Sequence, residues 1–156
     1  MLKLTTRLAT SDDLNALAAL FDAYRQFYEQ APDLNLAQRF IAERLKQQDS
    51  VIFVALDDER MLGFCQLYPT FCSVAAARIA VLYDLFVDAS ARKTGAGRAL
   101  MLAAQHYAAN NGYARLDLST AKTNLVAQAL YESLGWARDD IFFTYSKEIV
   151  TVPNKQ

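Results

Sequence analysis

The first part of the chain shows a period-two pattern followed by two helical patterns. Residues 3–8 alternate between apolar and polar side chains and predict an edge strand. Hydroxyl and carboxyl residues at 10–13 are typical of a helix start, and apolar residues three and four apart extend that helix to about Tyr28. A Pro-Asp break follows, and the same spacing predicts a second helix over about 36–47.

The middle of the chain reads as strands. A continuous apolar run at 51–56 predicts a buried strand, and the polar residues 57–60 predict a hairpin turn. We expect the return strand to cover 61–68 and to end at Pro69, since proline cannot donate to a ladder. A further strand is predicted from Arg78 to Val87.

Helices and strands then alternate to the C-terminus. A helix that follows the strand ending at Val87 is predicted to stop at 110–112, where a glycine can cap it. A short strand over 115–119, a helix over 124–133 and a final strand strongest at 141–149 complete the pattern. The order β-α-α-β-β-β-α-β-α-β predicts a mixed α/β sheet whose faces are covered by helices.

Size and charge narrow the class of protein. With 156 residues, more than half of them apolar, the chain is expected to form one domain over 1–156. Its net charge of −1 provides no basic surface for nucleic acid. No apolar stretch has the length of a membrane span or a signal peptide, so a cytoplasmic protein is expected. Cys65 and Cys72 are interpreted as small hydrophobes, and with His106 they are too few for a metal site.

The region 81–101 carries the clearest chemical signal. An apolar strand runs into the turn Arg92-Lys93-Thr94-Gly95-Ala96-Gly97-Arg98, and a helix pattern begins directly after it. The first N–H groups of a helix have no partner within the helix and lie at its positive end. With three cations beside it, this helix start is suited to binding phosphate.

Two familiar phosphate motifs do not fit this turn. A P-loop requires GxxxxGK[ST], whereas Lys93-Thr94 precede the glycines here. A dinucleotide fingerprint requires GxGxxG after the first strand of a βαβ unit, and both the third glycine and the strand position are wrong. What remains is Arg-x-x-Gly-x-Gly between a strand and a helix, or two glycines that merely form a tight turn.

The wider context resembles the GNAT superfamily of acyl-CoA N-acyltransferases, whose signature is [Gln/Arg]-x-x-Gly-x-[Gly/Ala]. Arg92, Gly95 and Gly97 match this signature. A second phrase, Asn124-x-x-Ala127-x-x-x-Tyr131-x-x-x-Gly135-Trp136, resembles the second cofactor motif of the family. The resemblance covers nearly the whole chain in element order and is most specific over 82–136.

The resemblance implies a fold, a cofactor and an activity. The fold would be a mixed, mostly antiparallel sheet of six to seven strands flanked by about four helices. The protein would be an acetyl-CoA-dependent N-acetyltransferase, in which the turn holds the pyrophosphate and the strand before it holds the acetyl and pantetheine groups. The residues expected to bind the cofactor are Leu85, Phe86, Val87, Arg92, Lys93, Thr94, Gly95, Ala96, Gly97, Arg98, Asn124, Ala127 and Tyr131.

Catalysis in such a family proceeds by direct transfer, so no covalent intermediate on the enzyme is needed. Tyr131 is the expected general acid for the departing thiolate, and its alternative role is core packing. Asp84 is a candidate base. Strict alternation would place Tyr83 and Asp84 on opposite faces, so that only one of them faces a given cleft. The polyamine-acetylating branch has an acidic pair where this chain has Tyr83-Asp84.

The acceptor is the less defined half of the reaction. Tyr24, Phe27, Tyr28 and Tyr83 are candidates for an aromatic cage around a small amine, although they could equally be core residues. A protein or peptide acceptor is the first alternative, and a non-catalytic acyl-CoA-binding module is the second. Many relatives dimerise, and the aromatic run 141–145 could supply an edge strand to a homodimer or lie within one subunit's sheet.

Overall fold

The computed structural model describes residues 1–153 and divides into two compact units, Met1–Ser119 and Thr120–Gln156. The first unit contains a five-stranded sheet in the order β1-β2-β3-β4-β5. Its strands are β1 Leu4–Leu8, β2 Val51–Asp57, β3 Arg60–Cys72, β4 Ala77–Val87 and β5 Arg115–Asp117. The first three neighbouring pairs are antiparallel and the β4–β5 pair is parallel.

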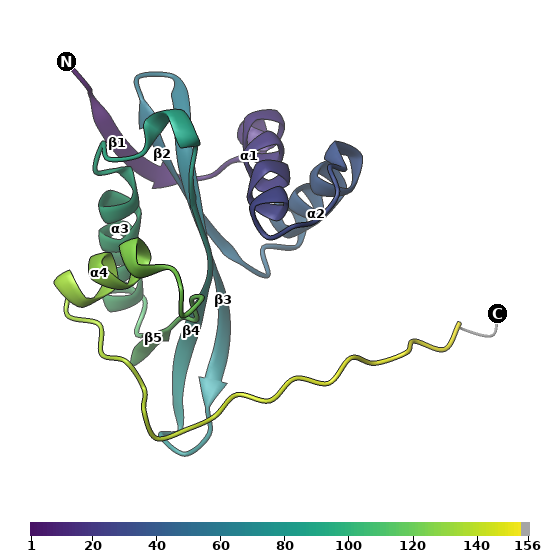
Figure 1. The fold of residues 1–156 in the computed structure, drawn as a ribbon, viewed down its shortest axis with the longest axis vertical. Helices are drawn as coiled ribbons and strands as arrows, with labels where there is room; N and C mark the ends of the chain where they lie inside the picture. The colour runs from purple at the N-terminus through teal and green to yellow at the C-terminus, as the bar shows by residue number, and fades with distance from the viewer. Residues whose placement is uncertain (154–156) are drawn as a thin grey trace. The chain divides into compact units, whose positions relative to one another are not determined.

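Three helices cover this sheet on its two faces. Helices α1, Leu14–Phe27, and α2, Leu34–Gln47, pack against one another on one face, and α3, Ala96–Asn110, packs on the other (Figure 1). The fold class predicted from the order of elements is therefore confirmed. No helix in residues 1–153 has the length and apolar character needed to cross a membrane.

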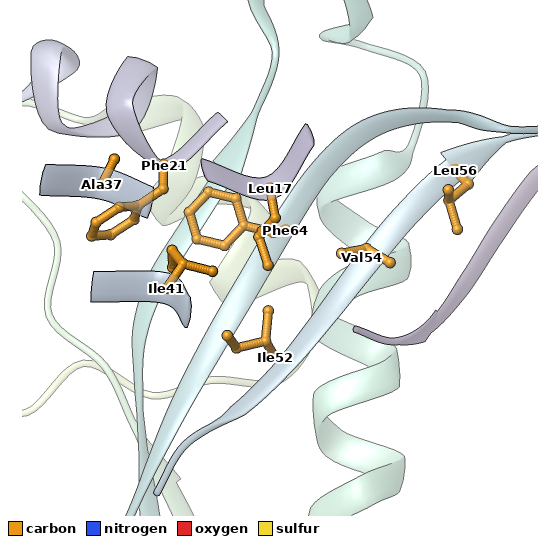
Figure 2. Packing of buried hydrophobic residues seen from close by; sticks show 8 residues of the cluster. All are labelled: Leu17, Phe21, Ala37, Ile41, Ile52, Val54, Leu56 and Phe64. Carbon is orange, nitrogen blue, oxygen red and sulfur yellow. The ribbon is translucent and has the colours of Figure 1, made fainter. Parts of the chain in front are cut away.

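The core between α1, α2 and the sheet follows directly from the helical and strand patterns. Leu17 and Phe21 of α1 meet alternate residues of β2 and Phe64 of β3 (Figure 2). The remaining members of this cluster are Ala37, Ile41, Ile52, Val54 and Leu56. Burying a Val, Leu, Ile or Phe side chain stabilises a fold by about 1.5–3 kcal/mol. The residues of β2 between them are also buried, which explains why 51–56 is apolar without a break.

One strand is longer than the sequence predicted. Pro69 does not end β3, which continues to Cys72 with Pro69 opposite Ala80 of β4. The pairing with β2 ends at Leu67, so beyond it β4 is the one strand partner of β3 among the described residues. A proline is tolerated at such an edge because a donor on the open side is not required.

The second unit contains helix α4, Leu125–Ser133, followed by an extended segment. The strand predicted over 141–149 is wrong: residues 137–153 form no strand, and the sheet has five strands rather than six or seven. Its apolar side chains are exposed, including Ile141, Phe143 and Tyr145. A strand needs hydrogen-bonding partners as well as β propensity, and no described strand pairs with this segment.

Candidate active site

A β-bulge in β4 shapes the candidate site. Asp84 lies opposite Gln66, whereas Leu82 lies opposite Leu67, so Tyr83 is an extra residue on β4. A bulge interrupts the strict alternation of side chains. Tyr83 and Asp84 consequently line the same cavity. The expectation that only one of them could face a given cleft is corrected by this bulge.

The cavity lies in the first unit and has a volume of about 650 Å³. Its walls come from α1, α2 and the central strands, and aromatic side chains predominate. The lining residues are Phe21, Tyr24, Arg25, Tyr28, Gln30, Phe40, Tyr68, Val81, Tyr83, Asp84 and Ser119. Among them, one carboxylate and one guanidinium carry formal charge. Such a volume and lining are typical of a small-molecule site.

Asp84 is the buried acid of this cavity, with 5 % of its surface exposed. Gln66 donates from Nε2 to Asp84 Oδ2 at 2.8 Å, and Tyr24 also donates a hydrogen bond to this carboxylate. Ser50 in turn donates to Gln66 Oε1 at 2.8 Å, which fixes the orientation of the amide. Burial raises the pKa of Asp84 above its ordinary value, and the two hydrogen bonds partly oppose that rise.

Two tyrosines of the cavity, Tyr24 and Tyr68, are held as neutral phenols. Burial, and then the nearby charge of Asp84, raises the pKa of Tyr68 to about 12. The same two causes raise the pKa of Tyr24 further. Tyr68 and Tyr83 meet edge to face with ring centroids 5.7 Å apart, and Tyr24 and Tyr28 do so at 5.2 Å. The result is an apolar wall around a single acid.

Three of the four predicted acceptor residues, Tyr24, Tyr28 and Tyr83, come together around this cavity. Phe27 does not line it. Phe27 lies at the end of α1 with just over half of its surface exposed, and the Arg92 guanidinium lies 5.9 Å from its ring centroid. Phe27 therefore contacts the predicted phosphate-binding turn instead.

The pairing between β4 and β5 ends at Val81. Pairing between β4 and β5 covers only residues 79–81, whereas pairing between β4 and β3 continues to Val87. Residues 82–87 of β4 thus have a strand partner on one edge only among the described residues. Leu85, Phe86 and Val87 lie in this part of β4 and are half-buried. An open strand edge offers main-chain N–H and C=O groups to a ligand.

The turn before α3 has the backbone geometry of an anion site. Gly95 is the N-cap of α3 with φ +90°, a left-handed conformation that favours glycine, and Lys93 also has positive φ. No side chain caps the helix at Gly95, and Gly97 lies in its first turn. Thr94 donates from Oγ1 to the Ala91 carbonyl at 2.7 Å, which ties the turn together. Arg92, Lys93 and Arg98 are exposed around it. These features fit a pyrophosphate.

The second unit holds the other predicted cofactor residues on α4. Asn124 is the N-cap of this helix, and its Oδ1 accepts a hydrogen bond from the Ala127 N–H at 3.1 Å. Tyr131 is half-buried, seven residues further along the chain, with its ring centroid 6.3 Å from that of Trp136. Asn124 therefore caps α4 with its side chain.

Sequence reasoning did not single out Gln66, Arg25 or Tyr68 as site residues. Gln66 is fully buried and donates a hydrogen bond to Asp84. In the sequence, the one sign of this role was an amide side chain within the apolar run 61–68. Arg25 and Tyr68 line the cavity because α1 and β3 bring them there. Such positions depend on tertiary packing, which spacing along the chain does not contain.

The sheet with its open β4 edge, the glycine turn at a helix start and the acid-containing cavity together define an acyltransferase-like site. The model of the Acetyltransferase (GNAT) family matches residues 15–136. The chain therefore belongs to the GNAT family, and it is an acyl-CoA-dependent N-acetyltransferase.

Named relatives agree with this assignment. A Bacillus subtilis (strain 168) protein called "Uncharacterized N-acetyltransferase YhfO" is 46 % identical over 139 residues, covering 89 % of this chain and 93 % of the relative. A "Probable acetyltransferase" of Haemophilus influenzae is 33 % identical over 96 residues, covering 61 % of this chain and 66 % of the relative. A solved structure titled "Crystal structure of a probable acetyltransferase" has a TM-score of 0.88 at 37 % identity and covers 95 % of this chain and 99 % of its own.

Proposed function

We propose that the protein transfers an acetyl group from acetyl-CoA to the primary amine of a small molecule. The observation that carries this proposal is the 650 Å³ cavity, in which the buried Asp84 is surrounded by aromatic side chains. An acid within an aromatic enclosure attracts an ammonium group through charge and cation–π contacts. A cavity of this volume suits a small acceptor better than a protein surface.

The two family motifs assign cofactor contacts to the turn and, separately, to α4. Backbone N–H groups of residues 93–98 would bind the pyrophosphate, with Arg92 and the other cations of the turn nearby. Main-chain groups of Leu85–Val87 would hold the acetyl and pantetheine groups along the open edge of β4. The Asn124 amide would hydrogen-bond the pantetheine arm, beside Ala127 on the same helix turn.

Direct transfer assigns roles to two side chains. Bound acetyl-CoA supplies the thioester that the amine attacks. Asp84 takes the proton that the amine loses, directly or through water, and its raised pKa makes it a stronger base than an exposed aspartate. Tyr131 donates a proton to the departing thiolate. The N–C bond forms as the C–S bond breaks, so no acyl group is carried by the protein.

Two measurements test this function. Acetyl-CoA at 100 times its dissociation constant should stabilise the protein by about 2.7 kcal/mol, readable as a thermal shift. Product analysis with a panel of small amines and a panel of peptides should show acetylated amines. Acetylation of peptides alone would identify a protein acceptor, and stabilisation without any product would identify a non-catalytic acyl-CoA-binding module.

We further propose that residues 1–156 act as one catalytic domain and that two copies associate. The family match runs from residue 15 to 136 and so includes parts of both compact units. The dimer proposal is supported by the exposed apolar side chains of the C-terminal segment. Contiguous exposed apolar surface is typical of an association site.

A further inference from the structure

The cavity contains a cation that the proposed chemistry does not use. Arg25 lies on α1 one residue after Tyr24, and it lines the same cavity as Asp84. Phe21, Tyr24 and Arg25 of α1 and Tyr28, its C-cap, are spaced three and four apart, so one face of this helix end presents all four to the cavity. About a fifth of the Arg25 side chain is exposed.

Arg25 has a buried donor without a hydrogen bond. Its Nη1 atom is inaccessible to solvent and makes no hydrogen bond within the described residues. Nη1 forms a long ion pair with Asp22, whose Oδ1 lies 3.9 Å away, beyond hydrogen-bond distance. That carboxylate is already bound elsewhere: Oδ1 accepts from the Asp33 N–H at 2.9 Å and Oδ2 from Gln26 at 3.1 Å.

A buried donor without a hydrogen bond is uncommon in a folded protein. Nearly all buried polar groups form a hydrogen bond, because leaving a buried group without one costs more free energy than an average hydrogen bond contributes. When such a donor is a guanidinium at the wall of a cavity, an anionic ligand group is the partner that its planar geometry fits. The same cavity has one acid, Asp84, for the opposite charge.

We propose that the acceptor is a zwitterion, an amine that also carries a carboxylate, and that Arg25 binds this carboxylate while Asp84 receives the amine. The inference rests on the proposed acetyl transfer to a small amine and specifies its substrate class as amino-acid-like. A polyamine does not fit, because it would bring a second positive charge to Arg25. The aromatic residues Tyr28, Tyr68 and Tyr83 would enclose an apolar side chain of the acceptor.

The test compares amino acids with their decarboxylated amines. Purified full-length protein is assayed with acetyl-CoA and three pairs: L-phenylalanine and phenethylamine, L-methionine and 3-(methylthio)propylamine, and L-lysine and cadaverine. Phenylalaninamide keeps the size of phenylalanine without the carboxylate charge. We expect kcat/KM for the better amino acids to exceed that of the matched amine and amide roughly 10- to 100-fold, the range of a hydrogen bond to a charged group.

Substitution of Arg25 supplies the second arm. Arg25→Gln should raise KM for the amino acids roughly 10- to 100-fold and leave kcat/KM for the decarboxylated amines nearly unchanged. Arg25→Lys should restore part of the preference, since it keeps the charge and loses the bidentate geometry. Arg39→Gln, at an exposed position of α2 outside the cavity, is the matched control and should alter nothing.

Several results would overturn the inference. Wild-type preference for the decarboxylated amine would exclude an anion at Arg25. An equal loss of kcat/KM for both members of a pair in Arg25→Gln would assign the residue a structural role. Acetylation of peptides alone, or stabilisation by acetyl-CoA without any acetylated amine, would reject the proposed function itself and the zwitterion with it. Acetylation of amines without discrimination would reject only the zwitterion.

Discussion

Asp84 is held between two opposing effects. Burial in an aromatic cavity disfavours its charge, whereas hydrogen bonds from Gln66 and Tyr24 favour it. The burial effect is larger, so the carboxylate is ready to accept a proton when it is ionised. This arrangement costs stability, since a group with a raised pKa in the folded state is more easily ionised when the chain is unfolded. Residues of this kind are more common at functional sites than elsewhere.

The first prediction concerns the effect of Asp84 on the stability of the fold. Asp84 binds its proton more tightly in the folded protein than in the unfolded chain, because its pKa is raised on folding. This proton binding stabilises the fold fully below the unfolded pKa of about 3.8. The stabilisation is lost as the pH rises through the raised pKa of the folded state. Asp84→Asn has no such pH-dependent loss. The difference in free energy of unfolding between the variant and the wild type should therefore be more favourable to the variant at pH 7 than at pH 4. The same change should lower kcat by about 10²- to 10⁴-fold. Urea titrations at both pH values and initial rates measure the two effects.

The second prediction concerns the residues that hold Asp84. Gln66→Leu removes the 2.8 Å hydrogen bond to the carboxylate, so the pKa of Asp84 should rise further. The acidic limb of the kcat/KM profile should then move to higher pH. Ser50→Ala removes only the hydrogen bond that Gln66 Oε1 accepts from Ser50. This change should move the acidic limb less, in the same direction. A limb that stays in place in both variants would mean that Asp84 is not the base.

The third prediction separates catalysis from binding at Tyr131. Tyr131→Phe keeps the ring that lies beside Trp136 and removes only the phenol oxygen. Turnover should fall about 10²-fold or more, while the acetyl-CoA dissociation constant measured by calorimetry stays within a factor of about two. Unchanged turnover would assign Tyr131 a packing role.

At the level of elements, α3 offers a matched pair of glycines at its two ends. Gly95 and Gly112 both have positive φ, so alanine at either position should destabilise the protein by roughly 1–2 kcal/mol. Only Gly95 belongs to the predicted phosphate-binding turn. Gly95→Ala should therefore weaken acetyl-CoA binding as well, and Gly112→Ala should not. Equal acetyl-CoA affinities in the two variants, measured by calorimetry, would remove the turn from the cofactor site.

The elements that local patterns specify were predictable. The helix from 14 to 27, the β2–β3 hairpin and the glycine turn before α3 each carry a period or a turn signal of their own. Two features could not be predicted in this way: the bulge at Tyr83 and the continuation of β3 beyond Pro69. Both depend on which neighbouring strand is present. Strand propensity at 141–149 also misled, since propensity alone provides no pairing partner.

The candidate site divides in the same way. Its cofactor half is contiguous in sequence, so motif and spacing were enough to predict a phosphate-binding turn at 92–98. Its acceptor half is assembled from α1, α2, β3 and β4. Asp84 and Tyr24 were recognisable from their neighbours along the chain, whereas Arg25 and Gln66 gain their meaning only from the cavity and the carboxylate beside them.

At the scale of the whole molecule, the C-terminal segment has several exposed apolar side chains. Phe142 is 79 % exposed and Phe143 is 89 % exposed, in a run that also contains Ile141 and Tyr145. Several large apolar side chains exposed together favour association, whereas isolated ones do not. A second copy of the chain would provide the missing cover, as in the proposed homodimer.

The mass in solution tests this directly. Light scattering coupled to gel filtration should give about twice the 17.4 kDa of one chain for the wild type. Replacing both Phe142 and Phe143 with Asp should shift the mass toward 17.4 kDa, because charge at these positions opposes burial against a partner. Val74→Asp, at a fully exposed position of the β3–β4 turn, is the control and should leave the dimer intact. A monomeric wild type at every concentration tested would reject the dimer, and an unchanged mass in the double variant would move the interface elsewhere.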